Sequence, residues 1–149
     1  MQDCGCWNWA EATPQEGLLS VIRDIWCGPA LAYAEDAIEE LRRNPADLVV
    51  TNESLFGVMA GCESIGQNLA MLSPNISLAP IPGILPLGPG LPPARTAEQR
   101  AQYAEIGLAC DAMFASGLPA LNVARAALGL SPLDHHLHQF RAARRELLA

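Results

Sequence analysis

The sequence has no lysine, and its nine basic residues are all arginines, set against 16 acidic residues. The formal net charge is therefore -7. Proteins that bind nucleic acids usually present a basic face that neutralises phosphate groups. The arginines here are scattered, except for Arg141, Arg144 and Arg145 near the C-terminus. We expect no nucleic-acid partner.

A long uninterrupted apolar run is also missing. The longest apolar stretch, 79–94 ("APIPGILPLGPGLPPA"), contains six prolines and three glycines. It cannot form the roughly 20-residue helix that a membrane span needs. The N-terminal "MQDCGCWNWAEA" lacks the basic start and apolar stretch of a signal peptide. These features predict a cytoplasmic protein without a membrane span.

The five cysteines include no Cys-x-x-Cys pair. An odd number of thiols without that spacing is typical of reduced, partly buried cysteines in a reducing compartment. The alternative is that Cys4 and Cys6 bind a metal or form a redox pair. What the sequence does have is 50% hydrophobic residues over 149 positions, enough for one domain with a core. We expect a poorly ordered segment over 1–16 and a single α/β domain over 17–149.

Hydrophobic spacing places helical segments at both ends of this domain. Apolar residues recur at helical spacing over 18–41, with an interruption at Gly28 and Pro29, which predicts one kinked helix or two short ones. Further on, Thr96 and Gln99 resemble a capping box at the start of a helix. That helix should run toward Gly117. A second helix should end at Gly129, and a third should be capped by Asp134. The final "ELLA" is predicted to be a short strand.

The middle of the chain has the pattern of a βαβ unit. A β-branched run at 46–52 and a second apolar run at 68–75 flank a helix that Ser54 can cap and Gly66 can close. Continuous apolar runs of this length suit buried parallel strands. The expected fold is α/β, with a short parallel sheet and many helices.

Ligands bind beyond the carboxyl ends of parallel strands. Polar residues follow both predicted strands: Thr51, Asn52 and Glu53 after the first, and Ser73, Pro74 and Asn75 after the second. The Pro/Gly-rich stretch leaves from the second end and can wall a pocket there. Its apolar side chains would line that wall: Ile81, Ile84, Leu85, Leu87 and Leu91. The alternative is a connector that packs its leucines under neighbouring helices.

Three further patterns point to no site. His135 and His138 have a spacing that metal ligands on a helix can use, but a solvated start of a surface helix is the favoured interpretation, and no metal is expected. Ser64 is not in a Gly-x-Ser-x-Gly elbow. The "GPG" at 88–90 is not a phosphate loop, because Pro89 lacks an amide donor.

The stretches "DLVVTNESLFGVMAGCESIGQNLAMLSPN", "PGILPLGPGLPPA" and "LNVARAALGLSPL" followed by "RAARRELLA" resemble the N-terminal, acceptor-binding domain of bacterial family 1 glycosyltransferases. These GT-B fold enzymes glycosylate macrolides, other polyketides and sterols. The resemblance covers about residues 17–149. It implies a partial Rossmann-like GT-B N-terminal domain. It also implies that the apolar loop lies beside a cleft for a hydrophobic acceptor. The residues expected to bind that acceptor are Phe56, Ser73, Asn75, Ile81, Ile84, Leu85 and Leu87.

The family also has a first strand that supplies a catalytic histidine and a C-terminal domain that binds the nucleotide-sugar. Neither matches this sequence, so we expect an internal fragment that is inactive alone and binds no cofactor. A nucleotide-sugar donor is implied for the full-length enzyme. Removal of the first strands predicts a sheet of about three strands that self-associates through an exposed edge.

Family members orient the catalytic histidine with an aspartate, and Asn52 occupies that position here. An amide can hydrogen-bond an imidazole but cannot offset its positive charge. Glu53 could replace the aspartate only if the turn directed it inward, and exposure to solvent is the expected fate. The alternative function is a non-catalytic α/β binding or interaction module with an apolar groove.

Overall fold

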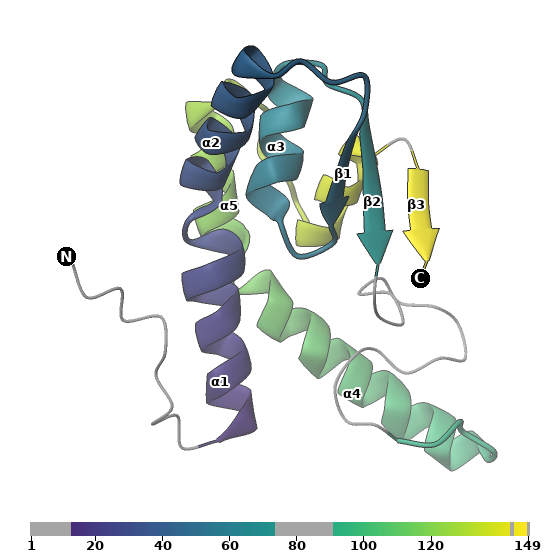
Figure 1. Cartoon of the computed structure of the whole chain (residues 1–149). Coiled ribbons are helices and arrows are strands. Elements are labelled where there is room, and N and C mark those ends of the chain that lie inside the picture. Colours follow the sequence, from purple (N-terminus) through teal and green to yellow (C-terminus); the bar gives the residue numbers. More distant parts are fainter. Residues whose placement is uncertain (1–12, 74–90, 144, 149) are drawn as a thin grey trace.

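The computed structural model describes residues 13–73, 91–143 and 145–148. It has the predicted α/β, Rossmann-like architecture: a parallel sheet of three strands in the order β1-β2-β3, covered by helices (Figure 1). Helix α3 lies between the sheet and the helices α2 and α5 (Figure 1). The division into segments 1–16 and 17–149 stays a prediction, although helix α1 already begins at Pro14.

The N-terminal helical region is interrupted between two helices, as Gly28 and Pro29 predict. Helix α1 (Pro14–Val21) continues into a π-helical turn, η1 (Ile22–Cys27), and Pro29 then precedes helix α2 (Ala30–Arg43). The missing amide of proline and its ring are incompatible with a helix interior. The chain therefore restarts its helix after this residue.

The sheet confirms the predicted βαβ unit. Strand β1 (Val49–Asn52) pairs in parallel with β2 (Leu69–Ser73), so that Val49 lies opposite Leu69. On the other side, β2 pairs in parallel with β3 (Arg145–Leu148), the strand predicted from "ELLA". Consequently β2 is central, and β1 and β3 are the edge strands of the described sheet.

Helix α3 (Phe56–Ser64) connects β1 to β2. Gly66 follows it with a φ of 68°, the left-handed conformation that glycine adopts most easily, and this confirms the predicted end of the helix. The predicted cap by Ser54 is wrong. The N-cap position is Leu55, and it makes no side-chain capping hydrogen bond.

Helices α2 and α3 touch through their backbones. A Cβ atom added to Gly57 would lie 2.2 Å from the carbonyl oxygen of Ala30. At Gly61, one turn later, it would lie 2.9 Å from the carbonyl oxygen of Ala34. Both distances are below what Cβ atoms tolerate, so only glycine fits at this crossing.

Helix α4 (Ala97–Ala115) begins with the predicted capping box of Thr96 and Gln99. Helix α5 (Leu118–Ala127) follows after a short turn and ends near Gly129, whose φ is 74°. The two helices differ in burial. Only Cys110 and Phe114 are buried on α4, whereas α5 contributes Leu121 and other residues to the core.

The stretch Ala97–Ala127, which contains both helices, is long and apolar enough to span a membrane by length and composition alone. Its most apolar window has a mean hydropathy of 1.4 and is 22% buried. Core helices of soluble proteins meet the same criterion, and within this stretch Phe114, Leu121 and Ala124 belong to the core. The expectation of no membrane span therefore stays a prediction.

Three of the five cysteines lie in the described part of the chain. Cys27, Cys62 and Cys110 are free thiols and are buried, as predicted. Burial raises the pKa of Cys27 to about 11 and also raises that of Cys62, because a thiolate is poorly solvated in an apolar environment. Cys4 and Cys6 lie outside the described residues.

Candidate functional site

The first part of the candidate site is the turn that leaves β1. The side-chain oxygen of Asn52 accepts two hydrogen bonds from Ser54, one from the backbone amide at 2.9 Å and one from the hydroxyl at 2.7 Å. The Asn52 carbonyl accepts a third from the amide of Leu55 at 3.1 Å. Asn52 thus shapes the turn from β1 into α3, a common use of asparagine.

Glu53 is directed inward by this turn and is only 1% exposed. The expectation that it lies in solvent is wrong. The hydroxyl of Ser73, at the end of β2, donates a 2.6 Å hydrogen bond to the Glu53 carboxylate. The amide of Glu53 also donates to the carbonyl of Leu72 at 3.1 Å, which continues the pairing of the two strands. The carboxyl ends of β1 and β2 are therefore joined by a buried carboxylate.

Phe56, the first residue of α3, is buried at the same edge of the sheet. Its ring stacks on Phe140 with the centroids 5.8 Å apart and meets the ring of His136 edge-on at 6.4 Å. The proposed acceptor-binding roles of Phe56 and Ser73 stay predictions. The other predicted acceptor-binding residues lie outside the described residues: Asn75, Ile81, Ile84, Leu85 and Leu87.

The second part of the site joins α4 to the 3-10 helix η2 (His136–Ala142). The side-chain nitrogen Nε2 of His135 lies 3.0 Å from a carboxylate oxygen of Asp111 on α4. His135, not the predicted Asp134, caps η2, because its Nδ1 accepts a hydrogen bond from the amide of Leu137 at 3.3 Å. One side chain therefore contacts both helices.

His136 is only 2% exposed, which corrects the expectation of a solvated helix start. Its ring stacks on Phe114 at 5.8 Å and on His135 at 4.5 Å. Burial is the main cause that lowers its pKa to about 4, and the neighbouring His135 lowers it further, against the opposing effect of Asp111. The imidazole is therefore neutral near pH 7.

One ligand atom from each of Asp111, His135 and His136 lies within 4.8 Å of the others. Among the described residues, Nδ1 of His136 is buried and has no hydrogen-bond partner. Sequence spacing could not reveal this cluster. The pair that the spacing suggests is His135 with His138, whereas Asp111 lies 24 positions before His135.

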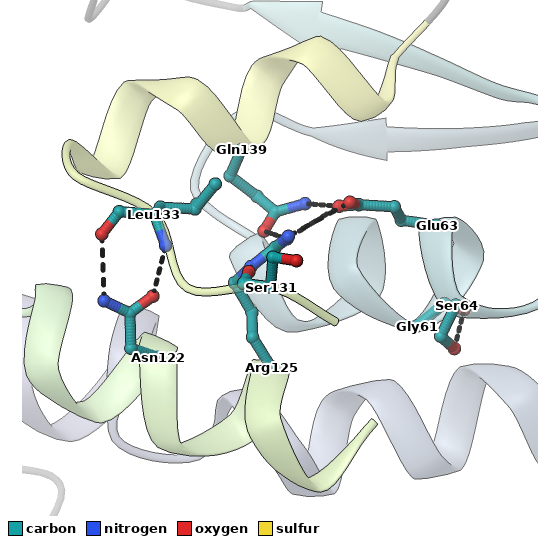
Figure 2. Close-up of polar contacts among 8 residues, drawn as sticks. All are labelled: Gly61, Glu63, Ser64, Asn122, Arg125, Ser131, Leu133 and Gln139. Atoms are coloured by element: carbon teal, nitrogen blue, oxygen red, sulfur yellow. Dashed lines mark hydrogen bonds and ion pairs between the residues drawn. The ribbon is translucent and has the colours of Figure 1, made fainter. Parts of the chain in front are cut away.

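An ionic network centred on the buried Arg125 holds η2 in place (Figure 2). Arg125 on α5 is 3% exposed and donates to the Glu63 carboxylate at 2.7 and 3.1 Å, to Gln139 at 2.6 Å and to the Ser131 carbonyl at 2.8 Å. Gln139 on η2 also donates to Glu63 at 2.8 Å. Partial burial raises the pKa of Glu63, but the hydrogen bonds from Arg125 and Gln139 outweigh it and lower the pKa overall.

A second contact fixes the loop between α5 and η2. The side chain of Asn122 accepts a hydrogen bond from the amide of Leu133 at 2.8 Å and donates one to the carbonyl of the same residue at 3.0 Å (Figure 2). Together with the network around Arg125, this contact determines where His135 and His136 lie. Neither contact has a signal in the hydropathy pattern, which shows only that α5 has an apolar face.

The fold and the polar carboxyl edge of the sheet place this chain among Rossmann-like α/β proteins. No protein-family model matches the chain. It is similar to 4'-demethylrebeccamycin synthase from Lentzea aerocolonigenes, with 34% identity over 91 residues. The match covers 56% of this chain and 22% of the relative. This similarity supports the resemblance to glycosyltransferases as a broad class, without distinguishing a domain or a fold type within it.

Proposed function

We propose that this chain is the acceptor-binding part of a GT-B fold glycosyltransferase. The whole enzyme would transfer a sugar from a nucleotide-sugar to a hydroxyl group of a hydrophobic small molecule. The observation that carries this proposal is the similarity to 4'-demethylrebeccamycin synthase over more than half of the chain. The βαβ unit agrees with it, since ligands of such sheets bind at the carboxyl ends of the strands.

The chain's own contribution would be a surface for the acceptor. The carboxyl ends of the strands carry the half-buried Asn52, and the apolar stretch 79–94 begins after five residues that follow Ser73, the last residue of β2. Apolar walls with a few polar groups are the usual composition of small-molecule sites. The nucleotide-sugar would be bound by other parts of a longer protein. A cytoplasmic location, the lack of a nucleic-acid partner and self-association through a sheet edge stay predictions.

Titration calorimetry of the chain tests this proposal. We expect weak binding of an uncharged macrolide or polycyclic acceptor and no detectable binding of UDP- or TDP-sugars. Replacing both Ile84 and Leu87 by aspartate should abolish acceptor binding. Leu48→Asp is the matched control. Leu48 is 53% exposed and directly precedes β1, so it lies at the amino end of that strand, away from the carboxyl ends. Micromolar binding of a nucleotide-sugar, or equal loss of acceptor binding in the control, contradicts the proposal.

The second candidate is a binding module without catalysis. The role of Asn52 favours it, because this side chain is engaged by Ser54 at the position where the family has its aspartate. In a longer parent protein that also carries a donor domain, Asn52→Asp keeps the side-chain oxygen that accepts both hydrogen bonds from Ser54. A working histidine dyad should gain roughly tenfold to a hundredfold in turnover, the equivalent of one charge-assisted hydrogen bond. Unchanged turnover with unchanged thermal stability supports the binding module.

A further inference from the structure

We propose that Asp111, His135 and His136 form a binding site for one divalent transition-metal ion, for which Zn²⁺ is the best fit. The inference is independent of the proposed sugar transfer. It rests on the position of three side chains that no sequence pattern brings together: one from α4, one from the N-cap of η2 and one from its first turn.

The donor set is one that zinc accepts. Two imidazole nitrogens and one carboxylate oxygen are common zinc ligands, and three protein ligands leave a fourth position for water or another molecule. Both histidines must offer a lone pair, which requires neutral rings. His136 offers its lone pair at Nδ1 in this state, since that atom is buried and has no hydrogen-bond partner among the described residues. Borderline-soft ions such as Zn²⁺ are favoured here over Mg²⁺ and Ca²⁺, which prefer oxygen ligands alone.

The buried Nδ1 of His136 is the second observation. A polar atom that is buried without a hydrogen-bond partner costs free energy, commonly about 1 to 3 kcal/mol. Nδ1 of His136 is such an atom in the described part of the chain, and the ring that carries it is wedged against Phe114 and His135. Coordination of a metal by Nδ1 would satisfy this atom.

Only small movements are needed to close the site. The three ligand atoms lie within 4.8 Å of one another, and tetrahedral zinc with bonds of about 2.0 to 2.2 Å places its ligands about 3.4 Å apart. The proton that His135 shares with Asp111 at 3.0 Å occupies the position the metal would take. That proton would move to Nδ1 of His135, so the long hydrogen bond from Leu137 would be lost.

The surrounding structure supports this arrangement. Gln139 lies on η2 and is bound to both Arg125 and Glu63, which fixes the helix that carries His136. Metal sites depend on such secondary contacts for the orientation of their ligands.

The test measures Zn²⁺ binding by calorimetry and Co²⁺ binding by absorption spectroscopy on the full chain. Cys4→Ser and Cys6→Ser are introduced in every sample, because N-terminal thiols can also bind these ions. We expect one ion per chain and a Co²⁺ spectrum without thiolate charge-transfer bands. Bound Zn²⁺ should also raise the melting temperature, because it binds the folded state.

Asp111→Asn and His135→Asn should each weaken Zn²⁺ binding at least tenfold. Both side chains are about one-third exposed, so these changes leave the core intact, and circular dichroism of the metal-free variants checks this. His138→Asn is the matched control, a neighbouring histidine outside the cluster, and should bind Zn²⁺ as the parent does. No stoichiometric binding, unchanged binding in both Asp111→Asn and His135→Asn, or an equal loss in His138→Asn overturns the proposal.

Discussion

Helices α3 and α4 are both rich in apolar residues, yet only one of them is inside the protein. Six of the nine residues of α3 are buried: Phe56, Gly57, Met59, Ala60, Gly61 and Cys62. On α4, two of 19 residues are buried, Cys110 and Phe114. Leu108 on α4 is 73% exposed. Apolar composition alone therefore does not decide whether a helix is buried here. Burial depends on which other elements pack against the helix.

The two helices are also held by different contacts. Helix α3 packs against α2, against η2 and against the strand β1. α4 is anchored near its C-terminal end, where Phe114 stacks on Trp26 with centroids 5.7 Å apart and on His136. We therefore expect substitutions on α3 to change the free energy of unfolding far more than substitutions along the exposed part of α4.

The largest effect is expected from Gly57→Ala on α3. The added methyl group would lie 2.2 Å from the backbone oxygen of Ala30, which cannot rotate away. Helices α2 and α3 would have to separate, and overpacking of this kind costs about 3 kcal/mol or more. Urea unfolding measures this loss. Gly17→Ala on α1 is the control, because nothing lies within 4 Å there, and it should be neutral or stabilising. Equal losses at both positions contradict the packing argument.

Arg125→Met should have the next largest effect. It leaves the Glu63 carboxylate without its ion pair and Gln139 without a donor. Removing one partner of a buried pair costs about 3 to 5 kcal/mol, and we expect about 2 to 3 kcal/mol because Glu63 is partly exposed. Arg43→Met breaks the exposed pair with Glu39 and is the control that should change little. If Arg125→Met lowers the free energy of unfolding no more than Arg43→Met does, the network does not stabilise the fold.

Acid should lower the free energy of unfolding through His136, whose ring contacts Phe56 on α3 and Phe114 on α4. Its pKa is about 4 in the folded protein and about 6.5 in an unfolded chain, so the unfolded state binds more protons between these values. The free energy of unfolding should fall by about 2 kcal/mol between pH 7 and pH 5, with no contribution from this residue at higher pH. Glu63, whose pKa is lowered, adds a loss only below its ordinary value of 4.5.

Urea titrations at several pH values, in the presence of a metal chelator, measure this dependence. His136→Phe keeps an aromatic ring between Phe56 and Phe114 but cannot be protonated. This variant should lose the decrease between pH 7 and pH 5. A decrease that persists in His136→Phe assigns the acid sensitivity to another group.

The smallest effect is expected from Leu108→Ser on α4. The side chain is largely in solvent, so its replacement should change the free energy of unfolding by about 0.5 kcal/mol or less. Thermal unfolding of both proteins is the measurement. A loss comparable to that of Gly57→Ala would show that the exposed surface of α4 is covered in solution, which removes the contrast between the helices.

Sequence patterns predicted the elements well, because these depend on local chemistry. The capping box at Thr96, the glycine after α3 and the break at Pro29 are all set by residues within one turn. The burial of Glu53 and His136 was predicted wrongly. Whether Glu53 points inward depends on the turn formed by Asn52 and Ser54, and the burial of His136 depends on α4, which is distant in sequence.

The same limit applies to the different burial of α3 and α4. Hydropathy records how apolar a helix is, and the glycines of α3 could be counted from the sequence. Their contact with Ala30 and Ala34 exists only once α2 is in place. Burial of a helix is thus a property of pairs of elements, and single-sequence patterns describe elements one at a time.

The buried thiols give each of these two helices its own reporter. Cys62 lies on α3 and Cys110 on α4, and a thiol reagent can reach a buried sulfur only when the structure around it opens. For Cys62 the raised pKa adds to this protection, since the thiolate is the reactive form. Labelling rates at the two cysteines, read separately by mass spectrometry, therefore measure how often each helix leaves its native position, without any engineered cysteine.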